Sequence, residues 1–386
     1  MRHATTVFTL LIRLIPHRRA EQLARNSGTE SRVRKLDWFA RLGALVFAQL
    51  TDCASLRALL HHVEELPFVR RALRIDRLAK STLTDALEKP VGELFRAVLN
   101  DLVGRLGQLA RSQRGRGNSR RWSELLTLID STHMSLCLSM FEWARSRKGD
   151  QAAVKLHIAY DLYLRAPEQF LITEGHVHDH NPKVVFTVEK GRTYVFDRGY
   201  FDLDYFDDIR DAGAHFVTRV KRGVMVLKYG ARRRTDERVL ADRHVTLGPD
   251  ADARMLRMVR YRDPQTRIVY EFITDRFDLS ATSIADAYKA RWQVELFFRF
   301  LKQHLRIKRF FGTSREAVEA QLYAALVAYV LVEIVRRISQ GAVGSLLAVL
   351  RSLRVALTTA HVEAEWFKRL QSSPHLHLLL AEELLA

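Results

Sequence analysis

The sequence has few cysteines, no long hydrophobic run and no secretion signal. Cys53 and Cys137 are the two cysteines, which excludes a disulfide framework and a thiolate metal cluster and favours a reducing compartment. The longest apolar run, Leu322–Val332, is shorter than the roughly 20 residues that a membrane span requires. The N-terminal apolar stretch is broken by Arg13 and Pro16 and has no small-residue cleavage site. A cytoplasmic protein without a membrane partner is expected.

Acidic residues are outnumbered by basic ones. Lys and Arg total 62 and Asp and Glu total 44, which gives a net charge of +18. Such a surface attracts phosphates, so nucleic acid is the expected partner. Of the 386 residues 47% are hydrophobic, enough for a substantial core. The sequence shows no internal repeat and no glycine-rich phosphate loop.

The first part of the chain is predicted to be helical, from Glu21 to about Ala110. Ser55 is a candidate N-cap, and another helix is expected to start near Ser81. Short helices joined by the basic turn 70–74 are compatible with a helix-turn-helix DNA reader. A small helical bundle with a basic surface has the same pattern, so both interpretations stay open.

A basic segment, Arg111–Arg121, ends this helical block. It contains five arginines and no acid, which is typical of a linker. The hydrophobic period then changes. Leu125–Ile129 is a short apolar run that ends at Asp130, as expected of a buried central strand.

Further strands and helices follow. Residues 154–162 alternate between apolar and polar side chains, and a turn joins them to Gln169–Thr173, which predicts two paired strands. Thr193–Phe196 is another short strand, and it ends at Asp197. Helices are expected at 181–190 and 200–211 and a strand at 214–220, so the layer is a mixed α/β structure.

In residues 221–278 strands no longer alternate with helices, and the pattern predicts an all-β insertion. Its four β-like runs are Met225–Tyr229, Val239–Val245, Met255–Tyr261 and Arg267–Thr274. After the helix described next, 317–339 is apolar and core-like, and the remaining residues predict helices with a polar hinge at Gln371–Pro374.

A basic amphipathic helix is predicted from Tyr288 to Arg309. On an ideal helix one narrow stripe carries Tyr288, Arg291, Glu295, Arg299, Lys302, Arg306 and Arg309. Glu295 is the single acid of this segment. A carboxylate among cations suits a divalent metal ion beside the phosphates of a polyanion. The alternative is that Glu295 forms ordinary ion pairs with Arg291 and Arg299, four residues away on either side.

Three carboxylates carry the proposed chemistry. Asp130 and Asp197 follow predicted strands, and groups at the carboxyl ends of adjacent strands converge at one edge of an open sheet. Glu295 completes a set of oxygen ligands that could hold two hard cations for phosphodiester cleavage. Three other aspartates compete for these places on the same grounds: Asp161, Asp179 and Asp275. The pattern alone does not choose among them.

Tyr288, Arg291, Glu295 and Lys302 form the pattern Y-x2-R-x3-E-x6-K. This pattern resembles the signature of the DDE transposases of bacterial insertion sequences, in the insertion-sequence-four family. Residues 128–132 and 196–200, which contain Asp130 and Asp197, resemble the first and second aspartate motifs of that family. The resemblance selects Asp197 over Asp275.

The resemblance implies cut-and-paste DNA transposition with two Mg²⁺ ions, for which Mn²⁺ can substitute. It implies Asp130, Asp197 and Glu295 as catalytic metal ligands, double-stranded DNA as partner and a homodimer in the DNA complex. The DNA-binding residues it implies are Tyr288, Arg291, Lys302, Arg299 and Arg198. The expected fold is α/β, a ribonuclease-H-like core interrupted by the β insertion and flanked by helical regions.

The domain boundaries expected on this basis follow the order of the chain. They are 1–110 for a helical DNA-binding domain, 111–121 for the linker, 122–220 for the first part of the core, 221–278 for the β insertion, 279–340 for the second part of the core and 341–386 for a helical C-terminal region.

One departure concerns the flipped base that some members of this family hold in a hairpin intermediate. The family often uses a tryptophan of the insertion, assisted by the signature tyrosine and arginine. The insertion here has no tryptophan. Its available aromatic residues are Tyr229, Tyr261, Tyr270 and Phe272, and stacking on one of them would contribute roughly 1–3 kcal/mol per base.

Two rival interpretations remain. A transposase-derived repressor would bind DNA without cleaving it, and a metal-dependent nuclease would cleave DNA without joining the ends. Retention of all three carboxylates argues against the repressor.

Overall fold

The computed structural model describes residues 6–26, 36–113, 121–144, 152–175, 186–232, 236–248, 254–305, 307, 309–339, 344–358 and 365–385. These residues form two compact units, each made of segments that are distant in sequence. One unit, here called the helical unit, comprises Met1–Asn118, Ser135–Ala152 and Arg299–Ala386; the other, the sheet unit, comprises Ser119–Met134 and Ala153–Phe298.

The helical unit combines the N-terminal and C-terminal parts of the chain. Its helices are α1 (Val7–Arg13), α2 (Arg18–Asn26), α3 (Trp38–Leu50), α4 (Leu56–Glu65), α5 (Pro67–Leu73), α6 (Lys80–Leu87), α7 (Gly92–Ser112), α11 (Arg315–Ile338), α12 (Leu346–Leu357), α13 (Glu365–Gln371) and α14 (Pro374–Leu385). Ser55 caps α4 as predicted, since its hydroxyl accepts the N–H of Ala58 at 3.2 Å. The expected hinge lies between α13 and α14.

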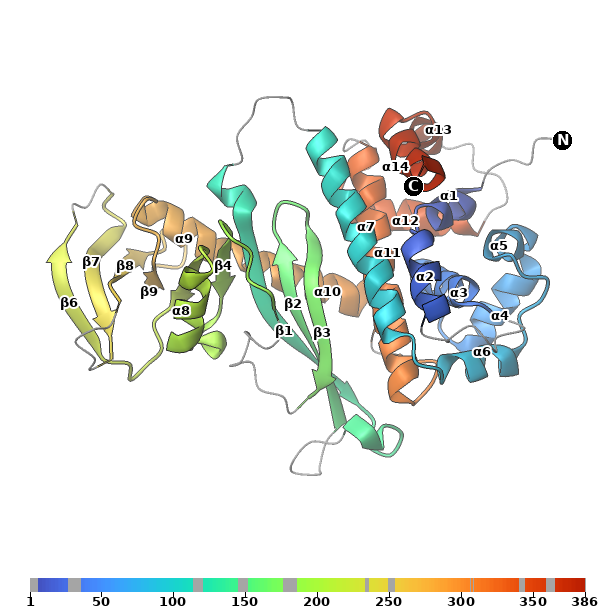
Figure 1. Cartoon of the computed structure of the whole chain (residues 1–386), viewed down its shortest axis with the longest axis horizontal. Coiled ribbons are helices and arrows are strands. Elements are labelled where there is room, and N and C mark those ends of the chain that lie inside the picture. The colour runs from blue at the N-terminus through green and yellow to red at the C-terminus, as the bar shows by residue number, and fades with distance from the viewer. Residues whose placement is uncertain are drawn as a thin grey trace. The chain divides into compact units, whose positions relative to one another are not determined.

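Helix α11 is the core of this unit. It packs against α3 and α7, and α7 and α11 run side by side in Figure 1. By length and composition α11 could cross a membrane, but 94% of its most apolar window is buried inside the protein. This burial agrees with the prediction of a core helix around Leu322–Val332.

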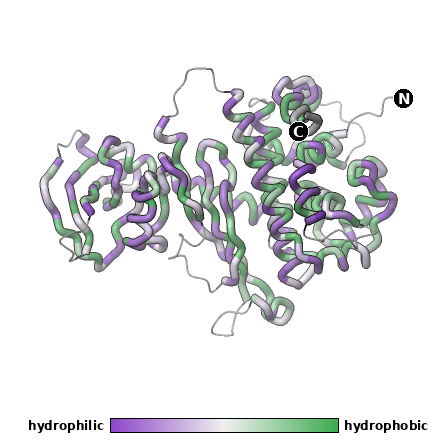
Figure 2. The backbone as a smooth tube through the Cα atoms, in the orientation of Figure 1, coloured by the Kyte–Doolittle hydropathy of each residue, from purple (hydrophilic) through white to green (hydrophobic). Residues whose placement is uncertain are grey.

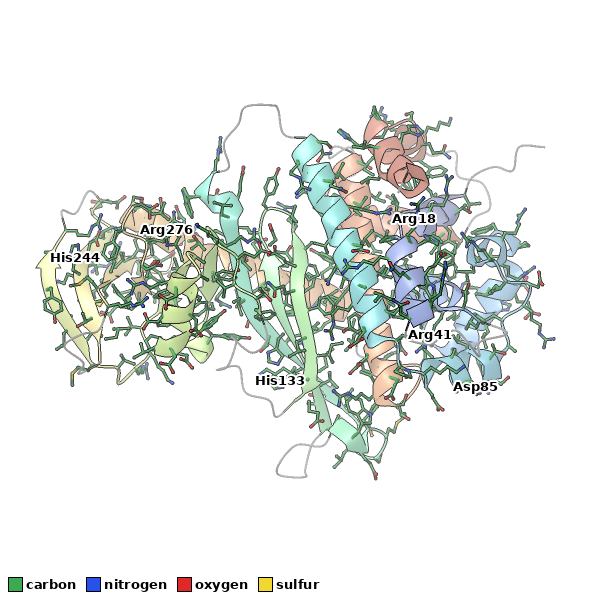
Figure 3. The ribbon with its side chains drawn as sticks, viewed as in Figure 1. Arg18, Arg41, Asp85, His133, His244 and Arg276 are labelled. Carbon is green, nitrogen blue, oxygen red and sulfur yellow. The ribbon has the colours of Figure 1, made fainter. Side chains whose placement is uncertain are left out.

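A buried arginine ties α3 to the connection between α6 and α7. Arg41, labelled in Figure 3, is 3% exposed and donates hydrogen bonds to the carbonyl oxygens of Leu87 and Lys89 at 3.3 and 2.9 Å. Burial lowers the pKa of Arg41 to about 10. Its carbonyl partners offset part of the cost of burying the charge.

The sheet unit is built on nine strands among the described residues, in the order β3-β2-β1-β4-β5-β9-β8-β7-β6. The strands are β1 (Leu126–Leu136), β2 (Ala152–Asp161), β3 (Ala166–Glu174), β4 (Thr193–Phe196), β5 (His215–Arg219), β6 (Val226–Ala231), β7 (Val239–Leu247), β8 (Leu256–Arg262) and β9 (Val269–Thr274). Its helices are α8 (Leu203–Asp211), α9 (Ala281–Ala290) and the first part of α10 (Trp292–His304).

The predicted pairing of β2 with β3 is confirmed, and the two strands are antiparallel. Strands β1, β4 and β5 are parallel neighbours. The four predicted runs of the insertion are strands β6 to β9, and β9 pairs with β5. The insertion therefore extends the same sheet. Figure 2 shows apolar residues recurring along β1 and β2, which are buried over most of their length.

Aromatic side chains hold α8 against the centre of the sheet. Phe206 of α8 stacks on Phe216 of β5 with ring centroids 4.3 Å apart, and on Phe196 of β4 at 5.8 Å. All three rings are buried. Burial of each ring is worth about 1.5–3 kcal/mol, and it fixes the end of β4 directly before Asp197.

Three local predictions were wrong. Strand β1 continues past Asp130 to Leu136. Of the helix predicted at 181–190, residues 186–190 are not helical and 181–185 lie outside the described residues. The predicted linker starts later, because α7 extends to Ser112, and 114–120 are outside the described residues.

The long basic helix is in fact two helices. Helix α9 ends at Ala290, Arg291 is its C-cap, and α10 runs from Trp292 to His304. Tyr288 and Glu295 therefore lie on different helices. Arg309 lies beyond α10, and Arg306 is outside the described residues.

A buried ion cluster joins β2, β3 and β4 where β1 and β4 begin. Two nitrogens of the Arg192 guanidinium donate to Asp161 Oδ2, each at 3.0 Å, and Arg192 also donates to Glu168. Burial raises the pKa of Glu168 to about 7, and the neighbouring Asp161 and Glu189 add to this against the opposing effect of Arg192. The carboxyl group is therefore more easily protonated in the folded chain than in the unfolded one.

This cluster gives a stability prediction. A carboxyl whose pKa rises on folding costs stability as pH rises from its ordinary value of 4.5 to about 7. Wild-type protein should lose unfolding free energy over this range, and Glu168→Gln should reduce that loss by about 2 kcal/mol. Urea unfolding between pH 5 and 8 measures the slope. Glu237→Gln, which changes an exposed glutamate of the same unit that takes no part in this cluster, is the control. An unchanged slope in Glu168→Gln would contradict the assignment.

Candidate active site

Asp130 and Asp197 lie side by side at the centre of the sheet. Strands β1 and β4 are parallel with Ile129 opposite Phe196, so each aspartate follows a paired residue. The Ser131 N–H donates to Asp130 Oδ1 at 2.8 Å, and the Arg198 N–H donates to Asp197 Oδ1 at 2.6 Å. The two strands are neighbours, which is the condition under which the ends of the two apolar runs could bring Asp130 and Asp197 together.

Arg291 links Glu295 to Asp130 by hydrogen bonds to both carboxylates. The Arg291 guanidinium donates to Asp130 Oδ2 at 3.2 Å and to Glu295 Oε1 at 2.7 Å. The Tyr288 hydroxyl donates to Asp197 Oδ1 at 3.3 Å. Two signature residues thus contact all three carboxylates.

The apolar face of α10 explains why Glu295 is placed here. Val294 and Phe297 are buried, and the Phe297 ring lies 5.2 Å from that of Tyr160 on β2. Glu295 is on the other face, with 30% of its side chain exposed. An amphipathic helix that buries its apolar face against the sheet keeps its polar face out of that contact, which leaves Glu295 free to pair with Arg291.

The carboxylates carry more negative charge than Arg291 offsets. Burial raises the pKa of Asp130 to about 6; the Ser131 N–H and Arg291 lower this pKa, while Glu295 and Asp197 raise it. The net rise means that the ionised form of Asp130 is destabilised in this environment. An additional cation would stabilise it.

The competing aspartates have other partners. Asp275 Oδ2 lies 2.7 Å from His215 Nδ1, and its Oδ1 accepts the N–H of Phe216 at the start of β5. The next residue, Arg276, is labelled in Figure 3 and donates to Asp278 and Thr193. Asp161 belongs to the Arg192 cluster, and Asp179 is outside the described residues.

The other predicted DNA-binding residues are on accessible parts of the chain. Arg198 is half-buried and begins a 3-10 turn (Arg198–Tyr200) directly after Asp197. Arg299 is exposed and Lys302 is half-buried, both further along α10.

A cavity of about 380 Å³ adjoins the carboxylates. Its wall includes Asp197, Tyr288 and Arg291, together with Arg219 of β5, residues of the insertion strands β8 and β9, and the aromatic residues Tyr261, Tyr270, Phe272 and Trp292. The Phe272 ring lies 5.0 Å from the Tyr288 ring and 5.9 Å from the Tyr270 ring. Arg219 lies over Tyr270 and Arg291 over Tyr288, at 5.0 and 5.8 Å from the ring centroids.

Trp292 is the residue of this cavity that sequence reasoning missed. It is 48% exposed and follows Arg291 directly. The aromatic residues expected to stack on a base all lie in the insertion, whereas Trp292 lies in the signature segment, directly after Arg291. Tyr229 of the insertion does not line the cavity; its hydroxyl lies 3.5 Å from that of Thr246.

The three carboxylates fit a divalent cation by donor type, since hard cations take oxygen ligands. Burial raises the pKa of Asp130, and the neighbouring carboxylates Glu295 and Asp197 add to this rise, so a cation bound here would stabilise the ionised form. Among the described residues, however, no three Asp, Glu, His or Cys side chains stand close enough to hold a metal ion as they are. Arg291 occupies the place between Asp130 and Glu295, so the fit requires Arg291 to move.

Comparison with known proteins identifies the class. Residues 121–331 match the family model described as a transposase DDE domain, and residues 3–64 match a domain of unknown function. A Sinorhizobium fredii protein that carries the name transposase y4zB is 35% identical over 254 residues, which cover 63% of this chain and 69% of the relative. A Geobacillus stearothermophilus protein named for the transposase of insertion sequence element IS5377 is 33% identical over 248 residues, 62% of this chain and 65% of the relative.

A third relative, from Synechocystis, is named for the transposase of element IS4SA and is 26% identical over 276 residues, 69% of this chain and 75% of its own length. These matches define an enzyme that acts on DNA. The chain belongs to the DDE transposases of insertion sequences. Proteins with this domain bind DNA and generally use divalent metal ions.

Proposed function

We propose that the chain cleaves DNA at the ends of its insertion sequence and joins them to a new site by cut-and-paste transposition. The observation that carries this proposal is that Arg291 and Tyr288 together contact all three carboxylates, Asp130 and Glu295 through Arg291 and Asp197 through Tyr288. Mg²⁺ is the proposed ion, with Mn²⁺ as a substitute. The strand order β3-β2-β1-β4-β5, with the first two strands antiparallel to each other and the last three parallel, supports a ribonuclease-H-like core.

Asp130, Asp197 and Glu295 would hold two ions at the end of β4. When bound, such ions activate a water molecule and stabilise the leaving oxygen of the phosphodiester. The N–H groups of Ser131 and Arg198 orient the two aspartates by hydrogen bonds to one oxygen of each. The second oxygen of Asp130 is held by Arg291 and would be the one to turn toward an ion.

The basic residues of α10 have a separate role in this proposal. Lys302 and Arg299 of α10 bind DNA phosphates near the scissile bond, as does Arg198 beside Asp197. These contacts position the DNA backbone without reading its sequence. A homodimer would bring two transposon ends together. The reaction takes place in the cytoplasm of a bacterial cell, at the nucleoid.

The cavity beside Asp197 is the proposed site for a flipped nucleotide. Tyr288 and Arg291 would hold it, and an aromatic ring of the cavity would stack on its base. The volume of about 380 Å³ and the adjoining rings of Tyr270 and Phe272 support this use. Extruding a base costs a few kcal/mol, which stacking offsets in part.

DNA binding by the N-terminal helices is proposed for α4, α5 and α6. A cavity of about 480 Å³ among these helices is lined by the cations Arg70, Arg77 and Lys80 and by the acids Glu64 and Asp76, and no side chain caps the start of α6. Arg70 donates to the carbonyl oxygens of Val63 and Glu64, so Arg77, Lys80 and the backbone N–H groups at the start of α6 are the groups proposed to bind phosphates.

The double substitution Arg77→Ala, Lys80→Ala in the full chain should therefore weaken binding of transposon-end DNA. The logarithmic salt dependence of the affinity should fall by nearly one unit for each lost phosphate contact. Fluorescence anisotropy between 50 and 200 mM salt, the range in which such contacts are lost, measures this slope. Arg25→Ala, which removes an exposed arginine of α2, is the control. An unchanged salt dependence would contradict DNA binding by α4 to α6 and would indicate that these helices have only a structural role.

The proposed reaction is tested with a duplex taken from the DNA that flanks the reading frame. Purified protein with Mg²⁺ should nick this duplex at the boundary of the element and then join the freed 3′ end to a second duplex. Binding without nicking would favour the repressor. Nicking without joined products would favour the nuclease.

A further inference from the structure

A cation of the chain itself, Arg291, occupies the candidate active site. Arg291 bridges Asp130 and Glu295 at 3.2 and 2.7 Å, and the Tyr288 hydroxyl contacts Asp197. The Arg291 side chain is 15% exposed, so this guanidinium is enclosed together with the acids it pairs. The bridge also explains why, among the described residues, the acids do not form a ready metal site.

The bridge leaves Arg291 incompletely satisfied. Its Nε is buried and has no hydrogen-bond partner in the described part of the chain. The same side chain lines the 380 Å³ cavity beside Asp197, whose wall also carries the cations Arg219, Arg238 and Lys289 and the acids Asp197, Asp263 and Asp286. A phosphate in this cavity can therefore pair with a cation, and the planar guanidinium of Arg291 matches phosphate as well as carboxylate.

We propose that Arg291 is an internal counter-ion that keeps divalent metal out of the site until a DNA phosphate in the cavity draws its guanidinium away. The proposal rests on the proposed function, because it takes Asp130, Asp197 and Glu295 as the metal ligands. Arg291 and a metal ion compete for the same two carboxylates. DNA removes this competitor, so DNA and metal bind cooperatively and the protein without DNA binds metal weakly.

The first test is Mn²⁺ binding to the full chain without DNA, measured by electron paramagnetic resonance of free Mn²⁺. Arg291→Met should bind Mn²⁺ at least about tenfold more tightly than wild type, because a positive charge hydrogen-bonded to two ligands is removed. Arg291→Lys should fall between them, since one ammonium does not reproduce the two-armed bridge. Thermal unfolding without metal checks that each variant is folded.

A matched control is available in the same unit. Arg254 also lies between two carboxylates, at 2.6 Å from Asp211 and 3.6 Å from Asp207. Neither of these is one of the three proposed metal ligands, and the Arg254 side chain is 45% exposed. Arg254→Met should leave Mn²⁺ binding at the wild-type level. A gain equal to that of Arg291→Met would show a general effect of net charge and overturn the proposal.

The second test adds a duplex of the sequence flanking the reading frame. This DNA should tighten Mn²⁺ binding to wild type by about tenfold or more, and the gain should be largely lost in Arg291→Met. Equal coupling in both proteins would overturn the proposal.

Failure of this inference is distinguishable from failure of the proposed function. If wild type and Arg291→Met bind Mn²⁺ equally and Asp130→Asn does not bind it, the metal site is supported and the counter-ion role of Arg291 is contradicted. If no protein binds Mn²⁺, with or without DNA, the metal site itself falls and the inference with it.

Discussion

Replacing Asp130, Asp197 or Glu295 by its amide should reduce DNA cleavage by about three orders of magnitude or more, equivalent to about 4 kcal/mol of transition-state stabilisation. Each change, Asp130→Asn, Asp197→Asn and Glu295→Gln, removes a negative charge with little change of shape. Binding of end DNA should stay close to wild type. Single-turnover cleavage of an end duplex and a binding assay on the same duplex separate the two effects.

Asp275→Asn is the matched control, because Asp275 also follows a strand but pairs with His215. This variant should cleave at the wild-type rate under conditions where it is folded. Strong cleavage by Asp130→Asn, Asp197→Asn or Glu295→Gln would remove that residue from the site.

Tyr288→Ala should remove hairpin products while leaving the first nick intact. The Tyr288 ring lies between Phe272 and Arg291 at the wall of the cavity, and its loss removes a contact for the flipped nucleotide. Loss of a contact worth about 1–3 kcal/mol corresponds to roughly a fivefold to 150-fold loss of hairpins. The assay uses an intact end to measure the first nick and a pre-nicked end to measure hairpin formation, and resolves nicks, hairpins and double-strand breaks on a denaturing gel.

Two comparisons sharpen this experiment. Trp292→Ala tests the exposed ring of the cavity wall, and Tyr229→Ala changes an insertion tyrosine that does not line the cavity. Tyr229→Ala should form hairpins normally. Normal hairpin yield in Tyr288→Ala, or a wild-type protein that never makes hairpins, would contradict the pocket assignment.

Much of the sheet could be predicted because its signals are local. Alternating side chains marked β2, short apolar runs marked β1 and β4, and repeated runs marked β6 to β9. The sequence made the adjacency of Asp130 and Asp197 depend on whether their strands are neighbours, which no local signal decides; the register of Ile129 with Phe196 shows that they are.

The predictions that failed depend on tertiary contacts. An ideal helix projection places Tyr288 and Glu295 on one stripe, but the chain breaks at Arg291 where α9 ends and α10 begins. The end of the apolar run before Asp130 is not the end of the strand, because β1 continues past Asp130 to Leu136. Helical spacing predicts an ion pair between Arg291 and Glu295 but not the second contact of Arg291 with Asp130, 161 residues away in sequence.

The central claim is that Asp130, Asp197 and Glu295 share metal ions on DNA. Its most direct test is a crystal structure of the full chain with Mn²⁺ and an end duplex, in which anomalous scattering locates the ions. We expect Mn²⁺ bound by all three carboxylates, with Arg291 turned from Asp130 toward a DNA phosphate. Mn²⁺ bound elsewhere on the chain, with Arg291 still bridging Asp130 and Glu295, would contradict the account.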